Sequence, residues 1–270
     1  MPVNLKGKIV LITGASSGFG EDAGRLFAAE GAKVILAARR VDRLQDIATQ
    51  LTEIGADTFV IQVDITSPSE IQQAVQKAID HFGRIDILFN NAGFGRLNWF
   101  EELDFSADIR KQIEVNLIGL MEITQAVLPF MIKQRSGHMI NMSSVSGFLA
   151  APLYSGYAAS KFGVRGFTDA LRRETSIYGV KVSGIYPGFA HTEFGQHTGS
   201  STVIKGINLP SWTYMSSKYV AQHVVKLARH PRSKVIIPWW FVPALWADAH
   251  FPSLVDYVIN QFFIKKYRQP

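Results

Sequence analysis

The 270-residue chain contains no cysteine, which excludes disulfide bonds, thiolate catalysis and zinc–thiolate sites. Its seven histidines show no metal-ligand spacing such as His-x-x-x-His, so no metal site is expected. No linker rich in glycine, proline or serine divides the chain, and no repeat or low-complexity tract is present. A basic segment followed by an apolar core is also missing at the start. We therefore expect a cytoplasmic protein with one domain over 1–270.

Short apolar segments rich in β-branched residues alternate with helical patterns along the chain, which is typical of βαβ units. The predicted strands are 8–12, 34–37, 58–63, 85–89, 138–142, 180–185 and 234–237. The predicted helices are 21–30, 42–54, 68–82, 106–133, 155–177 and 216–229. This order predicts an α/β fold with a doubly wound, mostly parallel sheet of seven strands, of the Rossmann type.

A glycine-rich turn connects the first predicted strand to the first predicted helix. It reads Thr13-Gly14-Ala15-Ser16-Ser17-Gly18-Phe19-Gly20, with the spacing G-x-x-x-G-x-G. Glycines let a backbone approach a pyrophosphate closely, and the N-terminus of the following helix offers unpaired N–H groups and a positive dipole end. The turn therefore predicts a dinucleotide site, and the simpler alternative is a glycine-rich turn without a ligand.

Tyr157 and Lys161 lie four residues apart in a predicted helix, so their side chains share one face. An ammonium beside a phenol favours the phenolate and lowers the pKa of the tyrosine from its usual value near ~10. Such a phenol is a competent general acid or base. Ser144 lies thirteen residues upstream, after a predicted strand. Ser143 and Ser144 are alternatively plain turn residues, and the spacing to Tyr157 favours Ser144 as the functional one.

Together these motifs resemble those of the short-chain dehydrogenase/reductase family, and the resemblance covers almost the whole chain. In order they are Thr13-Gly14-x-x-x-Gly18-x-Gly20, Asp64-Ile65, Asn90-Asn91-Ala92-Gly93, Asn116 in Val-Asn-Leu-Ile-Gly, Ser144 in Asn-Met-Ser-Ser, Tyr157-x-x-x-Lys161, and Pro187-Gly188 followed by Thr192. Each motif is short, but seven in the family's order and approximate spacing make a specific signal.

The resemblance implies a role for each matched residue. Tyr157 is the general acid or base, Ser144 stabilises the substrate oxygen, Lys161 lowers the pKa of Tyr157 and holds the nicotinamide ribose, and Asn116 supports a proton-supplying water chain. The implied cofactor contacts are Gly14, Ser16, Ser17, Gly18, Phe19, Gly20, Arg39, Asp64, Ile65, Asn91, Ala92, Gly93, Tyr157, Lys161, Pro187, Gly188 and Thr192. Family members usually form dimers or tetramers, so a homo-oligomer is expected.

The residues after the second predicted strand indicate which dinucleotide binds. The segment reads Ala37-Ala38-Arg39-Arg40, with no carboxylate before Asp42 to accept hydrogen bonds from an NAD ribose. A guanidinium pairs with a 2′-phosphate through two hydrogen bonds, so Arg39 predicts NADP(H). The alternative is that Arg39 and Arg40 are solvated charges at the start of a surface helix. Ser17 is not basic, so we expect no second phosphate contact from the glycine loop.

Other matched positions have plain structural alternatives. Asn116 within a helix could be a satisfied polar group of the core, and Asn90-Asn91-Ala92-Gly93 could bond backbone between strands. Asp64 could cap the following helix, and Thr192 could be an N-cap.

Substrate specificity is predicted from the segment 189–215, which is long for a connection and suggests a lid. Only Glu193 and Lys205 are charged within it. Apolar walls of this kind suit an apolar ketone, aldehyde or secondary alcohol. The alternative is that these side chains pack the lid onto the body. The expected wall residues are Phe94, Phe148, Leu149, Tyr154, Phe189, Phe194, Ile204, Ile207, Leu209, Trp212 and Tyr214.

The C-terminal extension 238–270 is aromatic and basic. From Lys226 to Pro270 the chain carries seven Lys and Arg against two Asp and Glu, which is +5 of the net charge of +6. Leu254, Val255, Val258, Ile259 and Phe262 form a helical apolar stripe followed by Lys265, Lys266 and Arg268. One interpretation is peripheral contact with an anionic membrane. The other, favoured here, is burial in a subunit interface or over the substrate pocket.

The sequence therefore predicts an NADP(H)-dependent oxidoreductase that interconverts an apolar ketone or aldehyde and the corresponding alcohol. One alternative is a non-catalytic, dinucleotide-sensing interaction protein on the same fold. Another is a reductase of lipid-like carbonyls at a membrane surface. Nucleic acid is not an expected partner, because basic residues are few and no binding motif is present.

Overall fold

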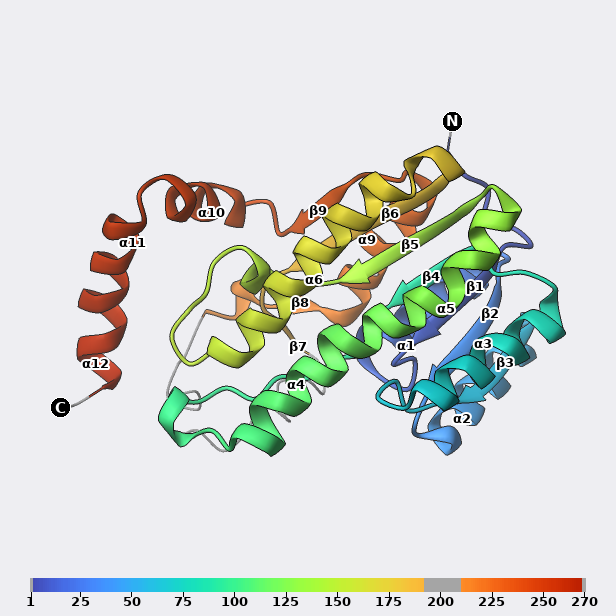
Figure 1. The fold of residues 1–270 in the computed structure, drawn as a ribbon, viewed down its shortest axis with the longest axis horizontal. Coiled ribbons are helices and arrows are strands. Elements are labelled where there is room, and N and C mark those ends of the chain that lie inside the picture. The colour runs from blue at the N-terminus through green and yellow to red at the C-terminus, as the bar shows by residue number, and fades with distance from the viewer. Residues whose placement is uncertain (1, 192–209, 269–270) are drawn as a thin grey trace.

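The structure, a computed structural model, describes residues 2–191 and 210–268. Seven parallel strands form the central sheet in the order β3-β2-β1-β4-β5-β6-β9 (Figure 1). Their bounds are β1 Ile9–Thr13, β2 Lys33–Ala38, β3 Thr58–Gln62, β4 Ile87–Asn90, β5 Gly137–Met142, β6 Val180–Pro187 and β9 Lys234–Ile237. The prediction of a seven-stranded parallel sheet is confirmed.

Helices cover both faces of this sheet, which explains why its strands read as continuous apolar segments. On one face, α1 (Gly18–Ala29), α2 (Val41–Glu53) and α9 (Ser217–Arg229) bury their apolar sides against the strands. On the other face lie α3 (Pro68–Phe82), α5 (Gly119–Gln134) and α6 (Ser155–Glu174). The doubly wound architecture of the prediction is therefore present.

The helix predicted at 106–133 is a continuous helical stretch from Phe105 to Gln134. It consists of η2 (Phe105–Arg110), α4 (Lys111–Ile113), η3 (Glu114–Ile118) and α5, and the two η elements are π-helical turns that the helical period alone does not reveal. By length and composition alone this stretch could cross a membrane. Its α5 part contacts α3, β4 and β5, so here it forms one layer of the fold.

Functional loops gather at the carboxyl ends of the strands. The strand order reverses between β1 and β4, and in such sheets ligands bind in the crevice at this switch point. The register pairs Ile12 with Phe89 and Asn90 with Asn141, so the loops after β1, β4 and β5 leave the sheet at one edge.

The two described ends of the segment 189–215 meet in a second, two-stranded sheet. It pairs β7 (Ala190–His191) with β8 (Met215–Ser216). The rest of the predicted lid, including Thr192, Phe194, Ile204, Ile207 and Leu209, lies outside the described residues.

The chain ends in a helical arm, defined here as residues Phe241 to Arg268. It comprises α10 (Phe241–His250), α11 (Pro252–Ile259), η7 (Asn260–Ile264) and α12 (Lys265–Tyr267). Figure 1 shows it in red, on the side toward which β4 and β5 point. The sequence analysis predicted no helix at α10, which contains Pro243. Pro243 lies in the first turn, where a helix tolerates proline.

Candidate active site

The turn after β1 is shaped by glycines at positions where a larger side chain would be strained. Gly14 has φ +64°, and a Cβ there would lie 2.8 Å from the Cα atom of Ala92. A Cβ on Gly20 would lie 2.4 Å from the carbonyl oxygen of Gly14. Helix α1 begins at Gly18, three residues earlier than predicted, so its first N–H groups belong to the turn itself. This geometry presents backbone donors and a positive helix end to an anion.

The segment after β4 holds this turn in place. The Asn91 side chain donates to the carbonyl oxygens of Thr13 and Gly14 at 3.1 and 3.2 Å. The Thr13 hydroxyl accepts from the backbone N–H groups of Asn91 and Ala92 at 3.0 and 3.1 Å. The Asn91 side chain therefore bonds backbone, which is the structural alternative given for this segment above. Ala92 lies close to Gly14, so little space separates the segment after β4 from the turn.

A cation that the sequence analysis did not assign to the glycine loop lies directly on it. Arg40 donates from Nε to Ser16 Oγ at 3.1 Å and from Nη2 to Ser17 Oγ at 2.7 Å. Arg39 points elsewhere: its Nη1 lies 3.8 Å from Asp64 Oδ2, and its side chain is 67% exposed. The prediction that the glycine loop adds no second phosphate contact considered Ser17 alone and did not place Arg40 at the loop. The adjacent Arg-Arg pair was the available signal.

Asp64 follows β3 and accepts hydrogen bonds from the backbone and hydroxyl of Thr66, at 2.9 and 2.8 Å. Burial raises the pKa of the Asp64 carboxyl, but the Thr66 bonds and the charges of Arg39 and Lys111 outweigh it and hold the pKa below its usual value. The N-cap of α3 is Ser67, so Asp64 does not cap that helix. Asp64 is thus an ionised acceptor beside Arg39.

Asn116 lies in the π-helical turn η3 and is completely buried. Its Oδ1 accepts from the Phe94 backbone N–H at 2.9 Å, and its Nδ2 donates to the Phe94 carbonyl at 2.8 Å and to Ser160 Oγ at 3.1 Å. The side chain therefore fastens the segment after β4 to the long helix. Nearby, Ile65 is buried, and a Cβ on Gly119 would lie 2.3 Å from its carbonyl oxygen.

The structure separates the two candidate serines after β5. Ser144 is hydrogen bonded to the Tyr157 hydroxyl, accepts from the Ser146 backbone at 3.1 Å and donates to the Pro187 carbonyl at 3.3 Å. Ser143 instead donates to the carbonyl of Lys161 at 3.0 Å and so holds the backbone of α6. Ser144 is the serine that faces Tyr157, as the spacing predicted.

Tyr157 and Lys161 lie in the first turns of α6, and both are buried. Burial raises the pKa of Tyr157 above its usual value; the Ser144 hydrogen bond acts in the opposite direction, and Tyr154 adds to the increase. Lys161 Nζ donates to the Met142 carbonyl at 3.1 Å and lies 5.6 Å from the Tyr157 ring centroid. Burial lowers the pKa of Lys161 to about 8. Burial of the phenolate outweighs the lowering expected for Tyr157, and the effect of Lys161 on that pKa stays a prediction.

One aromatic ring contacts Tyr157, and others cluster around Phe189, two residues after Pro187. The rings of Tyr154 and Tyr157 are 6.1 Å apart, and Phe189 lies 6.0 Å from both Tyr214 and Phe241. Sequence reasoning missed Phe241, the first residue of the arm. A Cβ on Gly188 would lie 2.3 Å from the Phe241 ring, so the motif Pro187-Gly188 supports the arm as well as the site.

Phe148, another expected wall residue, packs against the body. Its ring is 4.7 Å from the Tyr186 ring, and the Arg165 guanidinium lies 3.9 Å over it. Thr192, predicted as a cofactor contact, lies outside the described residues.

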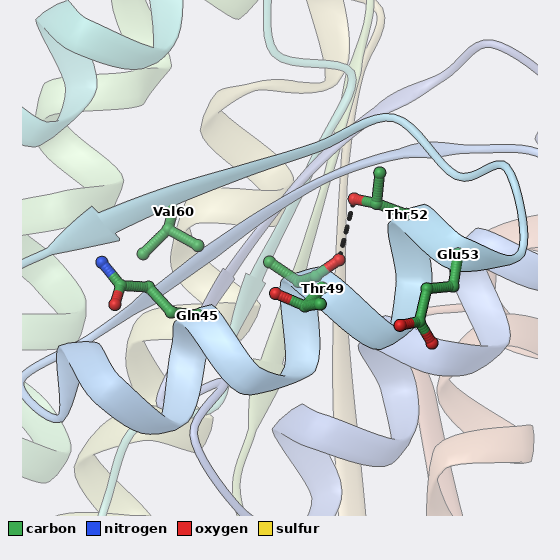
Figure 2. A pocket seen from close by; sticks show the side chains of 6 residues that line it. Gln45, Thr49, Thr52, Glu53 and Val60 are labelled. Carbon is green, nitrogen blue, oxygen red and sulfur yellow. Dashed lines mark hydrogen bonds between the residues drawn. The ribbon is translucent and has the colours of Figure 1, made fainter.

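A separate hollow lies between α2 and the edge strand β3. Figure 2 shows its lining residues Gln45, Thr49, Thr52, Glu53 and Val60. Thr52 uses its hydroxyl to bond the Ala48 carbonyl of its own helix at 2.8 Å. These residues belong to none of the matched motifs, whereas the loops at the switch point between β1 and β4 carry several of them.

Comparison with known proteins agrees with this site. The sequence pattern of the family described as short chain dehydrogenase matches residues 8–202. The chain is 35% identical over 237 residues to 3-oxoacyl-[acyl-carrier-protein] reductase FabG of Thermotoga maritima, covering 86% of this chain and 95% of that protein. The chain therefore belongs to the short-chain dehydrogenase/reductase family of oxidoreductases.

Solved structures share the fold. An alcohol dehydrogenase from Thermococcus sibiricus, complexed with 5-hydroxy-NADP, has a TM-score of 0.76 and 28% identity, with 86% of this chain and 96% of that chain covered. A short chain dehydrogenase/reductase from Burkholderia phymatum, in complex with NAD, has a TM-score of 0.83 and 24% identity, with 94% and 96% covered. Structural neighbours in this family thus bind either NAD or NADP.

Proposed function

We propose that this oxidoreductase is NADP(H)-dependent and interconverts an apolar ketone or aldehyde and the corresponding alcohol, with Tyr157 as general acid and base. The observation that carries the proposal is the hydrogen-bonded pair of hydroxyls on Ser144 and Tyr157, with Lys161 one turn away. It lies at the edge of the sheet that also carries the glycine loop.

The geometry supports a division of labour at the substrate oxygen. The nicotinamide cofactor supplies or accepts the hydride. In the reductive direction, Tyr157 gives its proton to the developing alkoxide while the Ser144 hydroxyl donates a hydrogen bond to the same oxygen. An ordinary tyrosine is protonated at neutral pH, and burial raises the pKa of Tyr157 further, so the phenol carries the proton to give. Lys161, fixed by the Met142 carbonyl, orients this end of α6.

The preference for NADP(H) is proposed from Arg39 and Arg40. Arg40 lies on the two serine hydroxyls of the glycine loop, and Arg39 lies beside the end of β3. Two guanidinium groups at this position attract a 2′-phosphate and offer it paired donors. The 5-hydroxy-NADP complex of the Thermococcus sibiricus enzyme favours the same cofactor, whereas the NAD complex of the Burkholderia phymatum protein, at 24% identity, supports only the fold.

The apolar substrate is proposed from the rings around the hydroxyl pair. Tyr154 places an aromatic ring beside Tyr157, and Phe189, which packs against Tyr214 and Phe241, follows Pro187-Gly188, so the surroundings suit a carbonyl flanked by hydrocarbon. The name of the Thermotoga maritima relative, a 3-oxoacyl reductase, also describes reduction of a ketone on an acyl chain.

The test is NADPH consumption with ketones and aldehydes of graded apolar size. We expect turnover to rise with apolar size and to fall by about 10²–10⁴-fold in Tyr157→Phe, because the proton donor is lost. Cofactor affinity should change little, which a fluorescence titration of NADPH checks. Tight NADPH binding without turnover on any carbonyl, and no difference between the variant and the parent, would instead support the dinucleotide-sensing alternative.

A further inference from the structure

The helical arm has one exposed apolar face, called here the outer face. Its members are large side chains that are between 44% and 76% exposed: Trp246, Phe251, Leu254, Tyr257, Val258 and Phe262. Trp246 and Phe251 contact each other with ring centroids 5.7 Å apart, so the face continues from α10 into α11. A cluster of this size on one element is unusual for a surface with no partner.

A second face of the arm is less exposed. Val255, Ile259, Phe263 and Tyr267 recur every four residues, and each is half-buried. At the end of the arm, the Arg268 guanidinium is paired with Glu101 and lies 4.6 Å from the Trp99 ring. The arm is thus anchored at both ends, at Phe241 and Arg268, with its outer face held away from the molecule.

Further indole rings extend this surface at the base of the arm. Trp239 is 76% exposed and Trp212 is 69% exposed. The ring of Trp240 lies 5.9 Å from that of Trp212, which joins the arm to the segment before β8. Four of the five tryptophans of the chain thus lie in the arm or at its base. Indole rings prefer the boundary between lipid and water, where one end is apolar and the other is hydrated.

We propose that the outer face of the arm docks on the surface of an anionic lipid bilayer. Lys265 and Lys266 are exposed at the end of the arm, next to Phe262, where they complement acidic headgroups. From Pro252 to Tyr267 the helix is about 24 Å long, shorter than the ~30 Å of a hydrocarbon core, and it contains Asp256 and Asn260. The arm therefore lies along the interface and does not cross it.

The same features favour lipid over a second copy of this chain. Subunit interfaces are depleted of lysine, whereas membrane-surface helices combine lysines with aromatic and aliphatic side chains in this way. The arm also touches the candidate site, since Phe241 packs against Gly188 and Phe189. Docking would therefore place the aromatic walls of the site close to the lipid.

Flotation of the full-length protein with phosphatidylcholine–phosphatidylglycerol vesicles tests the proposal. The test variant is Leu254→Ser/Val258→Ser/Phe262→Ser, and the matched control is Ile54→Ser/Ile177→Ser, which removes side chains that are 70% and 71% exposed elsewhere. We expect the parent and the control to float. The test variant should partition about tenfold more weakly for each large side chain removed. Phosphatidylcholine alone should bind less, and salt should weaken the binding to anionic vesicles.

Intact folding of each variant is checked by far-ultraviolet circular dichroism and NADPH binding, both of which should match those of the parent. A parent that does not float, or a test variant that floats as well as the parent, would overturn the proposal. The proposal would also be overturned if the parent were an oligomer, the test variant were a monomer, and both bound vesicles equally well. The outer face would then be a subunit interface. Light scattering after gel filtration gives that last readout.

Discussion

At the residue scale, the position of Arg40 shows what the sequence could and could not reveal about the cofactor. The Arg39-Arg40 pair was visible, but which of the two side chains reaches the glycine loop depends on the turn after β2. In the structure Arg40 bonds Ser16 and Ser17, and Arg39 pairs with Asp64. The proposed preference for NADP(H) therefore rests on both guanidinium groups, which would attract the 2′-phosphate.

Replacing Arg40 by alanine should weaken NADPH binding by about 10- to 100-fold, because hydrogen bonds to a charged group contribute ~1.5–3 kcal/mol. Binding of NADH should change much less, since NADH has no 2′-phosphate. Titrating both cofactors by intrinsic fluorescence gives the two dissociation constants, and Arg43→Ala on the same helix is the control. Equal weakening of both cofactors would show that Arg40 supports the loop without reading the phosphate.

His138 gives the protein a predicted sensitivity to acid. It is fully buried in β5, with Nε2 at 2.7 Å from Ser183 Oγ, and burial, aided by the charge of Lys181, lowers its pKa to about 3. The unfolded chain binds this proton near pH ~6.5, so stability is complete above that pH and is lost as the pH falls toward 3.

Urea unfolding at pH ~7.5 and ~5 should therefore show a loss of about 2 kcal/mol from this one group. His138→Gln should reduce the difference between the two pH values, whatever its effect at pH ~7.5. His230→Gln, at an exposed histidine, should leave the difference as it is in the parent. An unchanged difference in His138→Gln would contradict the account of His138.

At the scale of elements, most strands and helices follow from periodicity. The seven strands were predictable because both faces of a parallel sheet are buried and each strand is a short apolar segment. The π-helical turns around Asn116 were not, because one extra residue per turn leaves no mark on a short apolar pattern. Helix α10 was missed because the effect of Pro243 depends on its place in the helix.

Two glycine-to-alanine substitutions should have opposite effects on stability. Gly20→Ala places a methyl group 2.4 Å from the Gly14 carbonyl, so we expect a loss of about 1–3 kcal/mol and weaker cofactor binding. Gly166→Ala, in α6, meets nothing within 4 Å and should stabilise by ~0.5–1 kcal/mol through helix propensity. Chemical denaturation measures both. A Gly20→Ala protein as stable as the parent would contradict the close approach of turn and helix.

At the scale of the whole molecule, the sequence predicted that the candidate residues meet at one edge, because parallel strands bring their following loops there. Ser144 and Pro187 are 43 residues apart in the chain, yet a hydrogen bond joins them at that edge, where Ser144 also bonds Tyr157. The charge states were harder to predict. The effect of Lys161 on Tyr157 was expected from their spacing alone, whereas burial, which the spacing does not show, controls both pKa values in this structure.

The arm illustrates the same limit. Its apolar stripe was visible in the sequence, but which members of the stripe are exposed was not. Exposure depends on where α11 lies in the structure. Val255 and Ile259 are half-buried, whereas Leu254, Val258 and Phe262 are exposed. The protein thus combines a nucleotide-binding body with an aromatic arm that begins at the wall of its candidate site.

The most direct test of the central claim is the transfer of deuterium from NADPH labelled at C4 to an apolar ketone. The proposed function predicts that the label appears at the carbinol carbon of the product with the parent protein, and that Tyr157→Phe, still binding NADPH, yields at most about one hundredth of that product. NADPH oxidation without deuterium in the product, or equal labelling by the variant, would contradict hydride transfer with Tyr157 as proton donor.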